Sequence, residues 1–226
     1  MNLKLVKTGV FGIQGSGKTY IVEKELIHSF KKPFVYLLHP EDFRSCKTNV
    51  TVYIPYKLVK GKKMIDRSPE HLDRIIGLIV EQAKKGKYDA FILDEASTFL
   101  PKNYQSLQKY PNIIDLCDSH RHYGLAFVYM ARRPQVISTE ITETSEYLFL
   151  FAINGVNVNE YFGKIHEGFK ELMPSLTKDK HNFILMQLGE KPKLYKAIKQ
   201  KETKTNDKTR SKRITPNDES KHSSQR

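Results

Sequence analysis

The sequence predicts an α/β protein in which a mostly parallel sheet is covered by helices on both faces. Three observations support this prediction. Short apolar runs alternate along the chain with segments whose apolar residues recur every three or four positions. A glycine-rich turn at residues 12–17 joins the first apolar run to the first helical segment, and a later apolar run ends in the acidic pair Asp94 and Glu95. Strands that alternate with helices pair mostly in parallel, in sheets with helices on both faces.

In the amino-terminal half, apolar spacing and capping residues mark the elements. The helix after the glycine-rich turn places Val22, Leu26 and Phe30 on one face. Ser68 begins a later helix as its N-cap, with Pro69 at the first helical position, where the missing N–H is no loss. We therefore expect, in order, a strand at 8–13, a helix at 18–30, strands at 33–38 and 50–54, a helix from 69 that stops at Gly86, and a strand at 88–93.

The carboxyl-terminal half continues the alternation and closes with a hairpin. Apolar residues between Val158 and Leu172 keep helical spacing, and Gly189 and Glu190 mark a turn between two short apolar runs. The expected order is the end of a helix at 113–119, strands at 125–130 and 147–152, a helical region at 158–172, and a hairpin of 182–187 with 194–198.

One domain and one tail account for the 226 residues and 26.3 kDa. The hydrophobic fraction of 39% suffices for a sizeable core, which excludes a chain that is disordered throughout. Residues 200–226 contain one aliphatic residue larger than alanine, Ile214, and cannot bury enough apolar area to offset the entropy of ordering them. We expect a folded domain at residues 1–199 and a disordered basic tail at 200–226.

Several classes of protein are excluded. The sequence has no run of about 18 apolar residues, which excludes a transmembrane helix, and residues 1–4 do not begin a secretion signal. Cys46 and Cys117 lie far apart and outside any CxxC or Cys/His pattern. The cysteines therefore predict neither a disulfide framework nor a zinc site, and they fit a reducing cytoplasm.

The chain is strongly basic. It has 38 Lys and Arg against 25 Asp and Glu, a formal net charge of +13, of which +4 lies in the tail and +9 in residues 1–199. This charge favours a polyanionic partner, with nucleic acid first and acidic lipid second. A lysine-rich solubilising surface is the alternative interpretation.

The glycine-rich turn carries a phosphate-binding pattern. Residues 12–19 satisfy GxxxxGK[ST] and lie between a predicted strand and a predicted helix, as a phosphate-binding loop requires. The glycines let backbone N–H groups converge on phosphate oxygens. We expect Lys18 to reach the β- and γ-phosphates of ATP and the Thr19 hydroxyl to bind Mg²⁺. The other predicted nucleotide contacts are Gly12, Gln14, Gly15, Ser16 and Gly17.

The acidic pair supplies the partner of this loop. The apolar strand at 88–93 would place Asp94 at the carboxyl edge of the sheet, beside the phosphate-binding loop. We expect Asp94 to hold Mg²⁺ and Glu95 to polarise a water for attack on the γ-phosphate. An adjacent Asp-Glu pair therefore favours hydrolysis of ATP over transfer of its phosphoryl group to a small substrate.

Two basic segments flank the strand at 125–130. His120 and His122 precede it, and aromatic packing or hydrogen bonding is favoured for them over metal binding. Arg132 and Arg133 follow it, so both lie at the carboxyl edge, where a guanidinium can reach a γ-phosphate in its own subunit or in a neighbour. Solvated loop arginines are the alternative.

Together these motifs resemble the FtsK/HerA superfamily of P-loop ATPases. The resemblance covers about residues 8–152, and the segment His-Arg-His-Tyr-Gly at 120–124 is its more family-specific part, followed by Ala-Arg-Arg-Pro at 131–134. Within the superfamily, the chain resembles the genome-packaging ATPases of tailless icosahedral viruses and the zonula-occludens-toxin-like assembly ATPases of filamentous phage. Members often place Gln or Asn as a γ-phosphate sensor where this chain has Met-Ala-Arg at 130–132.

The resemblance implies a RecA-like core, a ring of about six subunits, DNA as the translocated partner and an arginine finger that acts across a subunit boundary. Arg132 and Arg133 match the finger. Because a residue that precedes proline avoids helical geometry, we expect Arg133 to reach the neighbour and Arg132 to contact its own site.

The predicted function is an ATPase that hydrolyses the β–γ phosphoanhydride bond of ATP and moves DNA into a preformed viral capsid. Double-stranded DNA is favoured over single-stranded DNA. Capsid proteins are further expected partners, and the expected location is the cytoplasm of the infected host cell, with association to the virion.

Two other functions stay open at this point. A filamentous-phage assembly ATPase threads single-stranded DNA through an inner membrane, but such proteins usually carry a transmembrane segment after the ATPase domain and this sequence has none. An ATP-switched DNA-binding protein would turn over slowly, at a rate that DNA does not change. A small-molecule kinase is disfavoured because Glu95 favours water as the acceptor.

Overall fold

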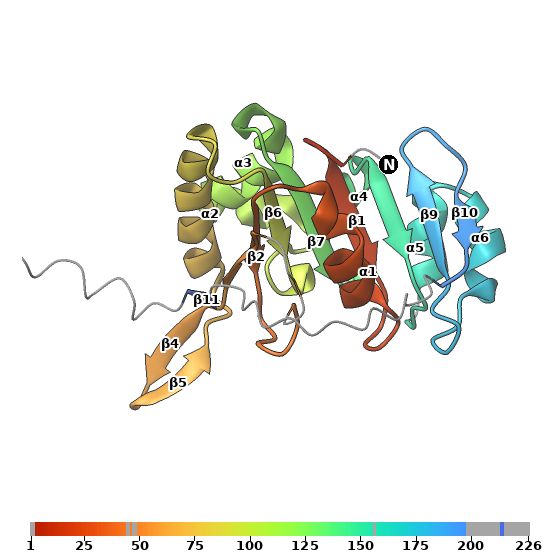
Figure 1. The fold of residues 1–226 in the computed structure, drawn as a ribbon. Helices are drawn as coiled ribbons and strands as arrows, with labels where there is room; N and C mark the ends of the chain where they lie inside the picture. Colours follow the sequence, from red (N-terminus) through yellow and green to blue (C-terminus); the bar gives the residue numbers. More distant parts are fainter. Residues whose placement is uncertain (1–2, 44–45, 47–48, 156, 198–212, 215–226) are drawn as a thin grey trace, which may run out of the picture.

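The computed structural model describes residues 3–43, 46, 49–155, 157–197 and 213–214, which fold into a sheet with helices on both faces (Figure 1). Nine strands of this part form one sheet in the order β10-β9-β8-β1-β7-β6-β2-β3-β11. All neighbours pair in parallel except β9, which is antiparallel to β8 and to β10. The strands are β1 (Lys7–Phe11), β2 (Pro33–Tyr36), β3 (Thr51–Tyr53), β6 (Ala90–Leu93), β7 (Ala126–Ala131), β8 (Tyr147–Leu150), β9 (Phe183–Gln187), β10 (Lys193–Tyr195) and β11 (Arg213–Ile214).

A separate two-stranded hairpin, six α-helices and six short 3₁₀ helices complete the described elements. The hairpin consists of β4 (Tyr56–Val59) and β5 (Lys62–Ile65), which pair antiparallel. The helices are α1 (Lys18–Lys24), α2 (Pro69–Lys84), α3 (Pro111–Ser119), α4 (Thr139–Glu143), α5 (Val158–Ile165) and α6 (Gly168–Leu172).

Alternation along the central strands divides the core into two layers. In β7, Phe127 and Tyr129 pack on one side of the sheet with α2, α3, α5 and α6, whereas Val128 and Met130 pack on the other side with α1. Side chains two residues apart share a face of a strand, so both faces need apolar residues when helices cover both. The predicted fold class, a mostly parallel sheet with helices on both faces, is confirmed.

The strand order places the two predicted nucleotide-binding segments on either side of one strand. β7 pairs with β1, which precedes the phosphate-binding loop, and with β6, which precedes the acidic pair. Because the three strands are parallel, their carboxyl ends meet at one edge of the sheet.

Several predicted elements differ in detail. The helix predicted at 18–30 ends as an α-helix at Lys24 and continues as a 3₁₀ turn at Leu26–Ser29, because Glu25 leaves helical geometry with φ of −122°. The helical region at 158–172 is broken at His166, whose φ is −159°. The hairpin β4–β5 was not predicted.

The proposed end of the domain at residue 199 lies outside the described residues. The predicted disordered tail at 200–226 does too, except for Arg213 and Ile214, which pair in parallel with β3. In the described part of the chain, no helix is both long enough and apolar enough to span a membrane.

Candidate functional site

The phosphate-binding loop is fixed between two strands. Residues 12–17 connect β1 to α1, and the backbone N–H of Gly12 donates to the carbonyl of Ala131 at 3.2 Å. The N–H of Ile13 donates to the carbonyl of Ala152 at 2.9 Å. The loop therefore begins as an extension of the sheet, held by the ends of β7 and β8.

Gly15 and Gly17 are among the glycines of the loop whose backbones a side chain would strain. Gly17, the N-cap of α1, has φ of 109°, and a Cβ there would lie 3.2 Å from the ring of Phe151. Gly15 has φ of 75°, and a Cβ there would lie 3.0 Å from Cε of Lys178. Glycine tolerates these conformations and leaves the backbone open to a close ligand. The loop thus fits a phosphate chain that contacts the backbone.

Lys18 presents a largely buried cation beside this loop. The residue is only 7% exposed, and its Nζ donates to the carbonyl of Ile13 at 3.1 Å. Burial lowers the pKa of Lys18, while the charge of Glu95 counters the shift. A buried ammonium is costly unless an anion is close, so this position favours a negatively charged ligand.

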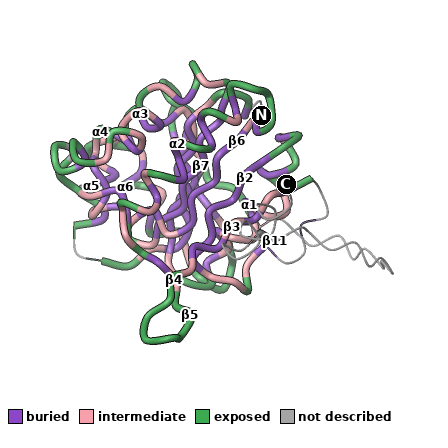
Figure 2. Tube along the Cα trace, turned by 90° about the vertical axis from the view of Figure 1, so that its left-hand side faces the viewer, coloured by how far each residue is buried: buried purple, intermediate pink, exposed green. Residues whose placement is uncertain are grey.

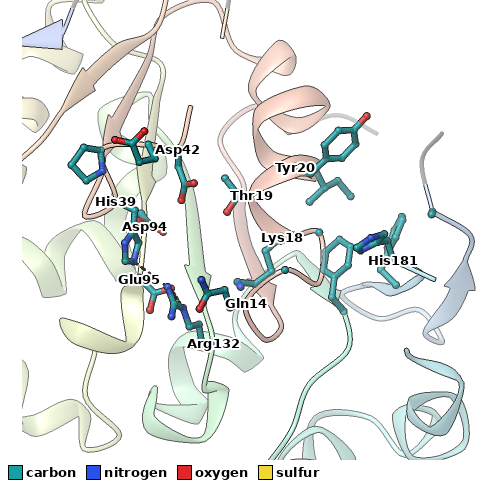
Figure 3. A pocket seen from close by; sticks show the side chains of 18 residues that line it. Gln14, Lys18, Thr19, Tyr20, His39, Asp42, Asp94, Glu95, Arg132 and His181 are labelled. Carbon is teal, nitrogen blue, oxygen red and sulfur yellow. Dashed lines mark hydrogen bonds and ion pairs between the residues drawn. The ribbon is translucent and has the colours of Figure 1, made fainter. Parts of the chain in front are cut away.

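Asp94 lies at the carboxyl end of β6, almost fully buried at 3% exposure. Its Oδ2 accepts a hydrogen bond from the N–H of Leu38 at 3.3 Å, which ties the carboxylate to the chain after β2. Burial raises the pKa of Asp94 to about 6, and the charge of Glu95 adds to the shift. Figure 3 shows Asp94 and Thr19 on opposite sides of the same cavity. A carboxylate and a hydroxyl are hard oxygen ligands of the kind that Mg²⁺ prefers, so the donor set fits the metal of a nucleotide site.

Glu95 and Arg132 form an ion pair at the mouth of this site. Arg132 follows β7 directly, and its Nε donates to Oε1 of Glu95 at 2.7 Å (Figure 3). Nη2 of Arg132 lies 3.1 Å from Nε2 of His39. Glu95 itself has a left-handed backbone, with φ of 51° and ψ of 49°. Such a conformation is uncommon for a residue with a side chain, and residues held in it cluster at functional sites.

A cavity of about 870 Å³ joins these groups. Most of the predicted site residues line it, and they come from the ends of β1, β6 and β7. The predicted residues at its wall are Gln14, Gly15, Gly17, Lys18, Thr19, Asp94, Glu95 and Arg132.

Three predicted residues do not line the cavity. Gly12 and Ser16 belong to the loop but are buried and do not face the cavity. Arg133 is exposed on the surface next to Arg132. The structure therefore separates the two arginines. Arg132 lines the cavity of its own chain, and Arg133 is exposed outside it.

The cavity also contains residues that the sequence did not single out. His39 and Asp42 come from the chain after β2, and burial raises the pKa of Asp42. His181 comes from the segment before β9. In Figure 3 it lies with Tyr20 on the side of Lys18 that is away from Asp94 and Glu95. His39 directly follows the strand predicted at 33–38, and no local pattern marks it or His181 as a site residue. Their position depends on strand order, which the sequence does not give directly.

The segment at 120–124 lies away from this cavity. It precedes β7 and therefore sits at the opposite edge of the sheet. His120 is buried and His122 is exposed, and Arg121 forms an ion pair with Glu146. Within the described ranges, no three His, Cys, Asp or Glu side chains are placed to hold a metal ion.

Comparisons with known proteins agree with this geometry. A family model for the zonular occludens toxin (Zot) matches residues 9–151. The genome packaging NTPase B204 of Sulfolobus turreted icosahedral virus 2, solved with AMPPCP, has a TM-score of 0.67 at 17% identity, over 86% of this chain and 98% of that chain. B204 of Sulfolobus turreted icosahedral virus, a DNA-packaging ATPase, also gives 0.67 at 17% identity, over 88% and 100%.

The N-terminal domain of zonular occludens toxin from Neisseria meningitidis has a TM-score of 0.49 at 13% identity, over 87% of this chain and 95% of that one. No curated protein sequence matches the chain. At these identities the B204 structures establish a shared RecA-like fold.

Proposed function

The chain belongs to the zonular occludens toxin (Zot) family of P-loop ATPases, and from this premise we propose that it is an ATP-driven motor that packages a viral genome. The observation that carries the proposal is the cavity in which Lys18, at the start of α1, meets Asp94 and Glu95, which follow β6. The resemblance in fold to the B204 packaging NTPases supports packaging as the task.

The residues of the cavity divide the work of ATP hydrolysis. Lys18 and the loop backbone bind the β- and γ-phosphates. Thr19 and Asp94 would hold Mg²⁺, which when bound would supply positive charge to the phosphate oxygens. Glu95 accepts the proton of a water whose oxygen attacks the γ-phosphorus, while the bond to the β–γ bridging oxygen breaks. Arg132 orients the Glu95 carboxylate through their ion pair.

DNA is the proposed cargo because the protein is strongly basic and DNA is a polyanion. The net charge of +13 suits a duplex, whose phosphates release counterions when lysines and arginines approach. We further propose a ring of about six subunits in which Arg133, exposed beside each cavity, reaches the neighbouring site. Such a motor would act on a preformed capsid, and with its capsid proteins, in the host cytoplasm.

The family match supports a second candidate, an assembly ATPase of filamentous phage that moves single-stranded DNA. The same cavity would serve it. The two differ in the preferred cargo, so duplex and single-stranded DNA should be compared directly. A third candidate, an ATP-switched DNA-binding protein, predicts turnover that DNA leaves unchanged.

Steady-state ATP hydrolysis tests the proposal. We expect Mg²⁺-dependent turnover that rises when duplex DNA is added, and loss of nucleotide binding in Lys18→Ala. A stronger response to single-stranded DNA would favour the assembly ATPase instead. Turnover without any response to either DNA would contradict a motor, and turnover in Lys18→Ala equal to that of the wild type would contradict the assignment of the site.

A further inference from the structure

The hairpin β4–β5 has no role in the nucleotide site, yet it is the element that projects most clearly from the body of the protein (Figure 1). Its strands meet at a two-residue turn, Lys60 and Gly61, whose φ values of 49° and 75° suit a tight hairpin. In Figure 2 the central strands are buried, whereas the hairpin is exposed along most of its length.

The composition of the hairpin is unusual for so exposed an element. Residues 56–65 contain four lysines and no acidic residue. They also contain two strongly exposed apolar side chains, Leu58 at 73% and Met64 at 51%. Lys57 pairs with Asp66 at 3.4 Å, and Nζ of Lys63 lies 4.2 Å from the ring centroid of Tyr56. Among the described residues, the lysines at 60, 62 and 63 form no ion pair.

The base of the hairpin is anchored to the body. The N–H of Asp66 donates to the carbonyl of Pro55 at 2.9 Å, and Oδ1 of Asp66 accepts from the N–H of Ser68 at 3.0 Å, at the start of α2. Tyr53, at the end of β3, hydrogen-bonds His71 at 2.9 Å. These contacts hold the hairpin in a defined direction, so its lysines are presented at a fixed place.

The register distributes the lysines over both faces. Lys57 lies opposite Met64, and Val59 opposite Lys62, on one face. Leu58 lies opposite Lys63 on the other face. Each face thus mixes cations with apolar side chains, and neither is the purely apolar face that a protein interface or a lipid core would cover.

A groove of duplex DNA matches this distribution. A two-stranded ribbon fits the major groove, which is about 12 Å wide, and phosphates line both walls. Strands of four residues extend about 13 Å, enough to enter a groove about 8.5 Å deep. Lysines on both faces can then meet both walls, while exposed apolar side chains contact the sugar and base edges.

We propose that the β4–β5 hairpin is a duplex DNA contact of this protein, with Lys60, Lys62 and Lys63 at the phosphates. The inference rests on the proposed function, since it names the element that holds the cargo. The hairpin follows the carboxyl end of β3, which pairs with β2, so it lies at the same edge of the sheet as the ATP cavity. The N–H of Leu37 donates to the carbonyl of Tyr53 at 2.9 Å, which directly links the chain after β2 to the end of β3.

The test is duplex DNA binding by the full chain as a function of salt. The triple variant Lys60→Ala, Lys62→Ala, Lys63→Ala should reduce the slope of log affinity against log salt by about 2 to 3, near 0.9 for each lost phosphate contact. Affinity at 100 mM salt should fall about tenfold or more. The corresponding triple arginine variant should retain affinity within about twofold, because its charges remain. Thermal unfolding and binding of an ATP analogue check that each variant is folded.

A matched control removes three lysines from the opposite edge of the sheet. Lys31, Lys85 and Lys87 are exposed there, and their replacement by alanine changes the net charge equally. DNA binding by this control should be close to that of the wild type. If the hairpin variant bound duplex as the wild type does, or if the control lost as much affinity, the hairpin proposal would be overturned while the motor would stand.

Two other outcomes point elsewhere. If the wild type failed to bind duplex at 50 mM salt, the proposed function itself would fail. Loss of binding to phosphatidylglycerol vesicles in the hairpin variant, with DNA binding intact, would assign the hairpin to a membrane surface and overturn the proposal.

Discussion

The ion pair between Glu95 and Arg132 offers a quantitative test of how the active site is built. Their N–O distance is 2.7 Å, and their side chains are 14% and 36% exposed. With an effective dielectric constant near 20, the direct attraction is about 6 kcal/mol. Desolvation and the ordering of both side chains offset most of it, so a partly buried, charge-assisted hydrogen bond should contribute roughly 1–2 kcal/mol net.

A double-mutant cycle measures this contribution. Glu95→Gln, Arg132→Gln and the double variant should be unfolded with urea, without nucleotide, and their free energies of unfolding compared. We expect a coupling energy of roughly 1–2 kcal/mol, because each single variant leaves a partly buried charge without its partner. The exposed pair of Glu81 and Lys84, whose atoms lie 2.9 Å apart, serves as the control and should couple by less than about 0.5 kcal/mol. A Glu95–Arg132 coupling as small as that of the control would refute the claim that Arg132 is held within its own active site.

Two further predictions concern the other basic groups. Arg133→Ala subunits and Lys18→Ala subunits are each expected to be nearly inactive alone. Mixing them should restore ATP turnover, because an intact arginine finger then meets an intact cavity in a neighbouring subunit. Mixed rings that recover no turnover would place Arg133 outside the mechanism. Burial beside Lys7 and Arg121 lowers the pKa of His120 to about 4. The unfolded chain therefore binds a proton at His120 more readily than the folded chain does. The free energy of unfolding should fall by up to about 3 kcal/mol as the pH drops from about 6.5 to 4. Urea unfolding of His120→Phe should lack this part of the pH dependence. If the variant kept it, the pH dependence would not come from His120.

Capping residues and apolar periodicity in the sequence predicted the helices and strands that bury one or two apolar faces. The helix α2 was predicted well because Ser68, Pro69 and Gly86 mark its ends and its apolar residues keep one period. The hairpin β4–β5 was missed because only Tyr56 and Ile65 at its base pack on the core, so its strands lack a regular alternation between apolar and polar positions.

The candidate site was predictable where its residues form contiguous motifs. Residues 12–19 and the pair Asp94 and Glu95 each follow a predicted strand. The alternation of strands and helices along the sequence was therefore enough to predict that they meet at one edge of the sheet. The contact of His39 with Arg132 joins residues far apart in sequence, and it depends on β2 and β7 both flanking β6. No local pattern carries that information, which is why His39 and Asp42 were not predicted.

Displacement of a third DNA strand tests most directly whether ATP hydrolysis moves DNA. A labelled oligonucleotide, bound as a triplex to a duplex, is released when a motor passes along the duplex. The wild type should release it in the presence of Mg²⁺ and ATP. Glu95→Gln should bind both ATP and the duplex yet release none, because loss of the water-activating carboxylate slows hydrolysis by about 10²–10⁴-fold. If the wild type hydrolysed ATP and bound the duplex but never displaced the third strand, the protein would be an ATP-switched binder and the account of it as a motor would be wrong.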